Sequence, residues 1–175
     1  MVEVVSYLRN NGFTVFMDSA CEREILRCLV NGVLDIPPDR MIGSNAGYVS
    51  TNQGDKPGDA HVYDQKSEKV VRSGIFLGEN GKNNKVFSIL TEIGRNPVLA
   101  FGNSSGDSSM LNYNLQNEKY HTESFYVICD DVERELGNLT RAEKDLETCR
   151  KNGWNAISMH DEFKTIYGDG VERTK

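Results

Sequence analysis

The feature that most constrains this chain is an alternation of two hydrophobic patterns. Apolar residues recur at helical spacing in segments that begin near residues 2, 25, 86, 107 and 142, and short apolar runs lie between them at 13–17, 98–101, 124–131 and 155–159. Two parallel strands need a long connection between them, which is usually a helix. The alternation therefore predicts an α/β fold with a doubly wound, mainly parallel sheet.

One stretch departs from this pattern. Residues 41–50, 60–65 and 69–76 read as short strands, and the turn-rich pieces 52–55 and 56–59 separate the first from the second. Gly, Pro, Asn and Asp are the usual residues of such turns. We therefore expect a β-hairpin excursion over about residues 41–76.

Length and composition narrow the class of protein. The 175 residues fit one domain, and the net charge of -6 argues against a general nucleic-acid binder. No run of apolar residues is long enough for a membrane helix, and the first residues lack the pattern of a signal peptide. The four cysteines form no C-x-x-C pair, so a zinc site is not expected. We expect a cytoplasmic chain with reduced thiols that binds neither nucleic acid nor membrane.

Three strand ends are candidate sites, because ligands of open α/β sheets bind beyond the carboxyl ends of the strands. They are Asp18-Ser19, the loop from Gly102 to Asp107, and Asp130-Asp131. Ser19 followed three residues later by Glu22 fits a capping box, so Ser19 is expected to be a helix N-cap. The same hydroxyl, at a helix start, is also suited to hold a phosphoryl oxygen.

The loop after the strand at 98–101 has two further interpretations. Asn103 and Asp107 are four residues apart around a glycine-rich turn, so both could face one Mg²⁺ ion. Asp107 could equally be only the N-cap of the helix that follows.

The same loop also fits the G-x-S-x-G pattern of esterases, with Ser104 as the nucleophile. Asp130 and His160 follow in the order that such hydrolases use. The glycine-rich oxyanion stretch that usually accompanies the pattern is absent upstream.

Lys82 and Lys85 stand at the start of the helix that covers residues 86–93. A lysine at a helix start opposes the helix dipole. Either both lysines are solvated, or one is directed at a phosphate and a neighbouring carboxylate, which would offset that cost.

In order and spacing, three segments resemble motifs two, three and four of the haloacid dehalogenase superfamily, in its phosphoserine-phosphatase-like branch. The segments are "VFMDSACER", "GKNNKVFSIL" and "VLAFGNSSGDSSML". The tail "GWNAISMHDEFKTIYGDGV" is similar to that of bacterial members. The "SAC" after the strand is similar to the "SAA" of phosphorylcholine phosphatases, which implies a choline-type ester as one candidate substrate.

This resemblance implies a Rossmann-like three-layer α/β/α sandwich and a magnesium-dependent phosphomonoester hydrolase. Ser19 and Ala20 would bind the phosphoryl group of a small phosphorylated molecule. Lys82, or alternatively Lys85, would be the motif-three lysine, and Asp107 with Asn103 would hold Mg²⁺.

The family's first motif, D-x-D-G-T/N, does not occur in the chain. It would lie upstream of the helix that begins near Val2, so the aspartyl nucleophile and the central strand that carries it are missing from this sequence. We therefore expect a phosphatase-like core with little or no turnover. A phosphate-binding module without catalysis is the alternative. We also expect the sheet to be completed by an upstream segment or a second chain.

Overall fold

The structure is a computed structural model that describes residues 1–167 and 170–171. It is a mixed α/β fold with two small, mostly parallel sheets and flanking helices. The chain divides into two compact units, Met1–Gly81 and Lys82–Lys175. Each unit is described by itself.

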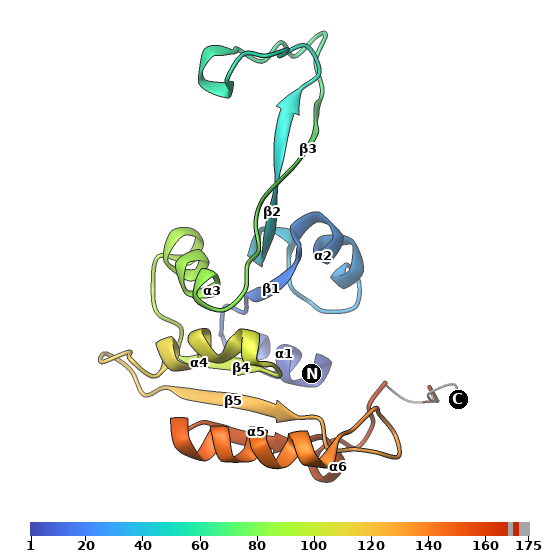
Figure 1. The fold of residues 1–175 in the computed structure, drawn as a ribbon, viewed down its shortest axis with the longest axis vertical. Coiled ribbons are helices and arrows are strands. Elements are labelled where there is room, and N and C mark those ends of the chain that lie inside the picture. The colour runs from blue at the N-terminus through green and yellow to red at the C-terminus, as the bar shows by residue number, and fades with distance from the viewer. Residues whose placement is uncertain (168–169, 172–175) are drawn as a thin grey trace. The chain divides into compact units, whose positions relative to one another are not determined.

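The first unit contains two helices and one three-stranded sheet (Figure 1). Its elements are α1 (Val2–Asn10), β1 (Met17–Glu22), α2 (Arg23–Val30), β2 (Met41–Ser50) and β3 (Val70–Gly78), with 3-10 turns at Pro38–Arg40 and Gly58–Ala60. β1 pairs with β2 in parallel, and β2 pairs with β3 in antiparallel. The sheet order is therefore β1-β2-β3, and β1 is an end strand.

Both predicted helices of this unit are present because each has an apolar stripe to bury. Val5 of α1 and Leu26 and Val30 of α2 pack with Ile36 and Met41 in one cluster. α2 ends at Val30, although Val33 continues the helical spacing of apolar residues that begins near residue 25. Val33 is largely exposed, so it adds nothing to the core that would extend the helix.

The hairpin excursion is confirmed by β2 and β3, which form a long two-stranded ribbon (Figure 1). Residues 60–65 do not form the predicted strand, because they fold into a compact turn around Glu68. The Glu68 side chain accepts hydrogen bonds from the His61 ring, at 2.8 Å, and from the Asp64 N–H, at 2.7 Å. Local hydrogen bonds of this kind compete with strand pairing.

The first strand lies later than predicted. We expected it at residues 13–17, but residues 13–16 belong to no strand, and β1 runs from Met17 to Glu22. Pairing can begin only where β2 begins, and the register aligns Met17 with Met41. Between Asp18 and Glu22 the register shifts, so residues 19–21 form a bulge.

The second unit contains the other sheet, in the order β4-β5-β6 with both pairings parallel. Its elements are α3 (Asn83–Ser88), continued by a π-helical turn (Ile89–Ile93), β4 (Leu99–Gly102), a 3-10 turn (Ser105–Asp107), α4 (Ser108–Asn114), β5 (Glu123–Ile128), α5 (Leu139–Asn152), β6 (Asn155–Ser158) and α6 (Met159–Glu162). These elements confirm the predicted segments to within a few residues at their ends. The short helix α6 was not predicted.

Alternation along β5 places Ser124, Tyr126 and Ile128 on one buried face of this sheet. Helices α4 and α5 cover that face and contribute Leu111 and Cys149 to the same cluster. Phe101 and Phe125 stack with ring centroids 4.8 Å apart, and Phe125 points to the other face of β5.

The predicted continuous parallel sheet is thus present as two shorter sheets, each with its own core. In the described residues, none of the helices is long and apolar enough to cross a membrane.

Candidate functional site

The loop that follows β4 is built around Asp107, a carboxylate with only 8% of its surface exposed. Gly102 lets this side chain approach the backbone, because a Cβ atom at position 102 would lie 2.6 Å from the Asp107 Cβ. The close approach explains why the strand ends in glycine. It also fixes the carboxylate at the carboxyl end of β4.

One oxygen of this carboxylate is held by the loop itself. Asp107 Oδ2 accepts hydrogen bonds from the N–H groups of Asn103 and Ser104, both at 3.0 Å, and from the Ser104 hydroxyl at 3.1 Å. Ser104 is the N-cap of the 3-10 turn, and Asp107 completes a capping box with it. Asp107 is also the N-cap residue of α4, as expected, but its side chain makes no capping hydrogen bond to that helix.

The other oxygen meets a buried lysine. Lys85 Nζ lies 3.0 Å from Asp107 Oδ1, and Lys85 is only 4% exposed. The Lys82 N–H donates to the Gly106 carbonyl at 2.9 Å, which joins the start of α3 to the loop and aims Lys85 at it. Lys82 thus contacts the loop through its backbone, whereas Lys85 reaches Asp107 with its side chain.

The ionisation of Asp107 follows from these contacts. Burial by itself would raise its pKa, but the Lys85 ammonium and the N–H and O–H donors of the loop outweigh it. The net effect lowers the pKa of Asp107 below its ordinary value. Asp107 is therefore ionised at neutral pH, where it forms a buried ion pair with Lys85.

Lys82 has a different environment. Its side chain is exposed, and its backbone has φ 52° and ψ -121°, the one positive φ among the described residues other than glycine. A side chain is strained in that conformation. Lys82 marks the turn into α3, and the strain shows that the turn is held by its surroundings.

Asn103 stands beside Asp107 with its side chain exposed. Mg²⁺ in proteins is commonly held by one or two side-chain oxygens together with water and ligand phosphate oxygens. Asn103 and Asp107 can supply two oxygens, and Oδ1 of Asp107 keeps accepting capacity beyond its bond to Lys85. Within the described residues, no three His, Cys, Asp or Glu side chains converge as a ready-made metal site.

Ser19 and Ala20 belong to the first unit, in the bulge of β1. The predicted capping box at Ser19 is wrong, because the N-cap of α2 is Glu22, whose carboxylate accepts from the Ile25 N–H at 3.1 Å. The Ser19 hydroxyl oxygen instead accepts from the Cys21 N–H at 3.1 Å. Strand pairing extends β1 up to the helix, so Ser19 lies too far upstream to cap it.

Two buried side chains, those of Asn80 and Ser44, hold this bulge by hydrogen bonds. Asn80 donates to Asp18 Oδ1 at 2.5 Å and to the Ser19 carbonyl at 3.0 Å. Ser44 donates to the Ala20 carbonyl at 2.6 Å and accepts from the Asn80 N–H at 2.9 Å. Neither residue was singled out from the sequence, because polar residues far apart in the chain carry no local signal of a shared contact.

Ser104 does not have the contacts of an esterase nucleophile. Its hydroxyl donates to Asp107 and accepts from the Gly106 N–H at 3.2 Å. The His160 ring contacts Asp161 at 2.7 Å. Within the part of the chain that the structure describes, no contact between Ser104 and a histidine is found, and the capping role accounts for the serine.

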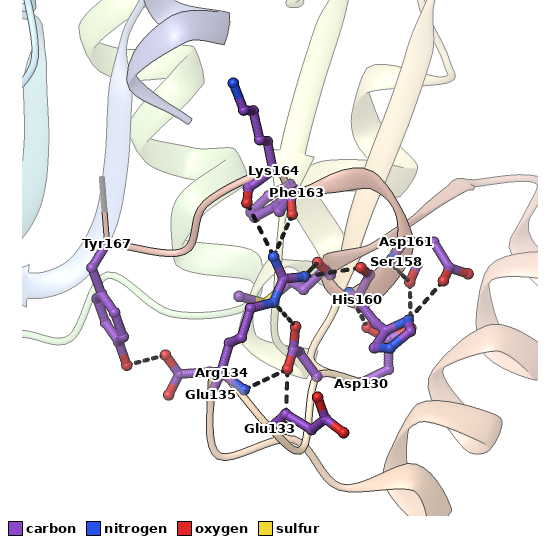
Figure 2. A network of polar contacts seen from close by, with 12 residues as sticks. Asp130, Glu133, Arg134, Glu135, Ser158, His160, Asp161, Phe163, Lys164 and Tyr167 are labelled. Carbon is purple, nitrogen blue, oxygen red and sulfur yellow. Dashed lines mark hydrogen bonds and ion pairs between the residues drawn. The ribbon is translucent and has the colours of Figure 1, made fainter. Parts of the chain in front are cut away.

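The third strand end, at Asp130-Asp131, is a structural clamp (Figure 2). Asp131 is fully buried and accepts from the Arg134 backbone N–H at 2.6 Å and from Arg134 Nε at 2.5 Å. The two terminal nitrogens of Arg134 donate to four carbonyl oxygens of the segment after β6, those of Met159, His160, Phe163 and Lys164.

Asp130 ties the same segment from the other side. It accepts from the Ser158 hydroxyl at 2.6 Å and from the His160 N–H at 3.0 Å, as Figure 2 shows. The acids at the end of β5 therefore fasten the end of β6. Asp131 and Arg134 lie only three residues apart in a turn, so this pair is local in the sequence.

No protein-family model matches this chain, and no curated protein matches it. The fold and the residues themselves therefore carry the functional argument.

Proposed function

We propose that this chain is a phosphate-binding core of the phosphomonoester-hydrolase type. The observation that carries the proposal is the buried Lys85–Asp107 pair at the carboxyl end of β4. Burying two charges is costly unless they are paired and hydrogen-bonded, and such pairs are common at functional sites. The strand-end position is where open α/β sheets bind ligands.

Each residue has a definite part in this proposal. Lys85 offers positive charge to a phosphoryl oxygen, and Asp107 holds the Lys85 side chain in place. In the first unit, taken by itself, the bulge of β1 at Ser19 and Ala20 offers neutral donors to a phosphate. Asn103 and Asp107 would hold Mg²⁺, which would neutralise negative charge on the bound phosphoryl group.

Turnover is a separate question from binding. The printed sequence contains no Asp-x-Asp pair, so it offers no aspartyl nucleophile with an acid two residues on. Asp18 is engaged by Asn80. We therefore expect this chain to bind a small phosphorylated molecule and to hydrolyse phosphomonoesters negligibly by itself.

The end strands β1 and β4 also belong to the proposal. An end strand offers unpaired backbone groups to another strand. We propose that an upstream segment or a second chain supplies that strand and, with it, the nucleophile. Addition of such a segment should then raise turnover.

The direct test is a calorimetric titration of the full chain with inorganic phosphate, performed with and without Mg²⁺. Saturable binding is expected, and Lys85→Met should weaken it. Lys82→Met is the matched control, because it removes a lysine three residues away whose side chain is exposed. Circular dichroism would confirm that both variants are folded, and Ser19→Ala provides a second variant if Lys85→Met is not.

Two outcomes would contradict the proposal. Absence of phosphate binding at millimolar concentration would remove the binding function. Robust hydrolysis of a phosphomonoester by this chain alone, abolished by Asp107→Ala, would show that the nucleophile is present after all. Labelling by a fluorophosphonate probe that Ser104→Ala abolishes would instead favour the esterase alternative.

A further inference from the structure

The bulge of β1 has a backbone arrangement that a regular strand does not have. In a regular strand, successive carbonyl groups point to opposite edges. Here the carbonyls of Ser19 and Ala20 accept hydrogen bonds from Asn80 and Ser44, and these two donors are themselves joined at 2.9 Å. Two successive carbonyls therefore face one buried group.

The N–H groups of the same two peptides must face the other way. Both peptides are trans, and a trans peptide places its C=O and N–H on opposite sides. The Ala20 N–H therefore points away from Asn80, and the Cys21 N–H points away from Ser44. The Cys21 N–H donates to the Ser19 hydroxyl oxygen at 3.1 Å, which leaves that hydroxyl's own proton to be donated elsewhere.

The buried side is fixed and the opposite side is open. Asn80 is 4% exposed and Ser44 is 2% exposed, whereas Ala20 is exposed. Asp18 and Glu22 pair with β2, and Ala20 lies in the bulge between them. The Ala20 N–H therefore takes no part in the hydrogen bonds between β1 and β2. Successive N–H groups turned to one side form a concavity that suits an anion.

We propose that Asn80 and Ser44 are positioning residues that turn the Ala20 N–H and the Ser19 O–H toward a phosphoryl oxygen. This inference rests on the proposed function, because it assigns the bulge to a ligand of the same chemical class, a phosphate. Asn80 and Ser44 do not touch the ligand; they act by holding the two carbonyls. No covalent step is involved.

The test is a titration of the full chain with inorganic phosphate. Nuclear magnetic resonance records the chemical shifts of the backbone amides at each phosphate concentration. In the wild-type chain, the Ala20 amide signal is expected to move on titration. Ser44→Ala and Asn80→Ala should each weaken phosphate binding about tenfold, which corresponds to the loss of one hydrogen bond of ~1.4 kcal/mol. Both should also reduce the movement of the Ala20 signal at saturation.

Asn52→Ala is the matched control. Asn52 also donates to a backbone carbonyl of the first unit, that of Ser67 at 3.3 Å, but it lies in the turn after β2. This variant should bind phosphate like the wild type. The comparison separates a general loosening of the unit from a loss of positioning at the bulge.

The outcomes distinguish the two proposals. If the wild type does not bind phosphate, the proposed function fails and this inference fails with it. If the wild type binds and the folded Ser44→Ala and Asn80→Ala chains bind equally well, only this inference is overturned. A wild-type Ala20 amide that stays still while phosphate binds also overturns it, and that measurement requires no variant to fold.

Discussion

At the scale of single residues, the buried pair of Lys85 and Asp107 is the most consequential contact. Removing one partner of a buried ion pair leaves an uncompensated charge and typically costs about 3–5 kcal/mol. The N–H and O–H donors on Asp107 Oδ2 remain, so we expect Lys85→Met to cost about 3 kcal/mol, the lower end of that range. Urea unfolding would measure this change.

Lys82→Met is again the control for that experiment, because the Lys82 side chain is exposed. It should change the free energy of unfolding by less than about 0.5 kcal/mol. Equal effects of the two substitutions would contradict the assignment of Lys85, and not Lys82, as the partner of Asp107.

The backbone of Lys82 leads to a second prediction at this scale. With φ 52° and ψ -121°, the residue occupies a region that glycine tolerates and other residues do not. Lys82→Gly should therefore stabilise the chain by about 1 kcal/mol, although glycine also gives the unfolded chain more freedom. Lys82→Ala keeps the Cβ atom and should show no such gain in thermal unfolding. Destabilisation by glycine relative to alanine would show that the turn is not strained.

At the scale of elements, the clamp after β5 explains how the ends of β5 and β6 are held together. Arg134 joins Asp131 to the carbonyls of the segment after β6. The turn that carries Arg134 is tight, because a Cβ atom at Gly137 would lie 2.5 Å from the Asp131 backbone. Glycine is therefore required at position 137 by close packing.

The clamp should be local in its effect. Arg134→Lys cannot reproduce the planar fork of donors, so it should release the segment after β6 nearly as fully as Arg134→Met. Amide hydrogen exchange of residues 159–164 should become at least about tenfold faster in both variants. The reason is that this segment would open locally once Arg134 no longer holds its carbonyls. Exchange in β2 and β3 serves as the internal reference and should not change. Rescue by lysine would show that charge alone holds the segment.

At the scale of the whole molecule, both units carry carboxylates that are stabilised in the ionised form. In the first unit, hydrogen bonds from the Asp64 N–H and the His61 ring lower the pKa of Glu68. In the second unit, the pKa of Asp131 is lowered chiefly by the Arg134 backbone N–H, and that of Asp107 is lowered by Lys85 and the loop donors against the opposing effect of burial.

These directions fix the sign of the pH dependence. A carboxyl group whose pKa is lower in the folded chain adds stability above its unfolded pKa and loses it as the pH falls through the folded value. The ordinary values are 3.8 for Asp and 4.5 for Glu, so stability should be full above about pH 5 and should fall below about pH 4. Urea midpoints from pH 3 to pH 7 would measure this, with Asp107→Asn expected to flatten the acid limb. A midpoint that rises on acidification would contradict the prediction.

Local pattern was enough to predict most elements of the fold. The stripes of α1, α3 and α5, the hairpin of β2 and β3, and the runs of β4 and β5 could all be found from the sequence, because period and turn residues are local signals. The strand at residues 13–17 was misplaced because the position of β1 depends on its partner, which begins at Met41. The prediction of a strand at residues 60–65 was wrong because hydrogen bonds to the Glu68 side chain form a turn there.

The sequence by itself determined the alternating α/β character of the chain, the hairpin, and the loop that carries Asn103 and Asp107, since these depend on neighbours in the chain. Only the tertiary structure decided that Lys85 meets Asp107, that Asn80 and Ser44 hold the bulge at Ser19, and that Arg134 reaches the carbonyls of the segment after β6. Such contacts depend on where separate elements pack. Burial then gives each contact its strength, because a charge or carbonyl removed from water must find its partner within the fold.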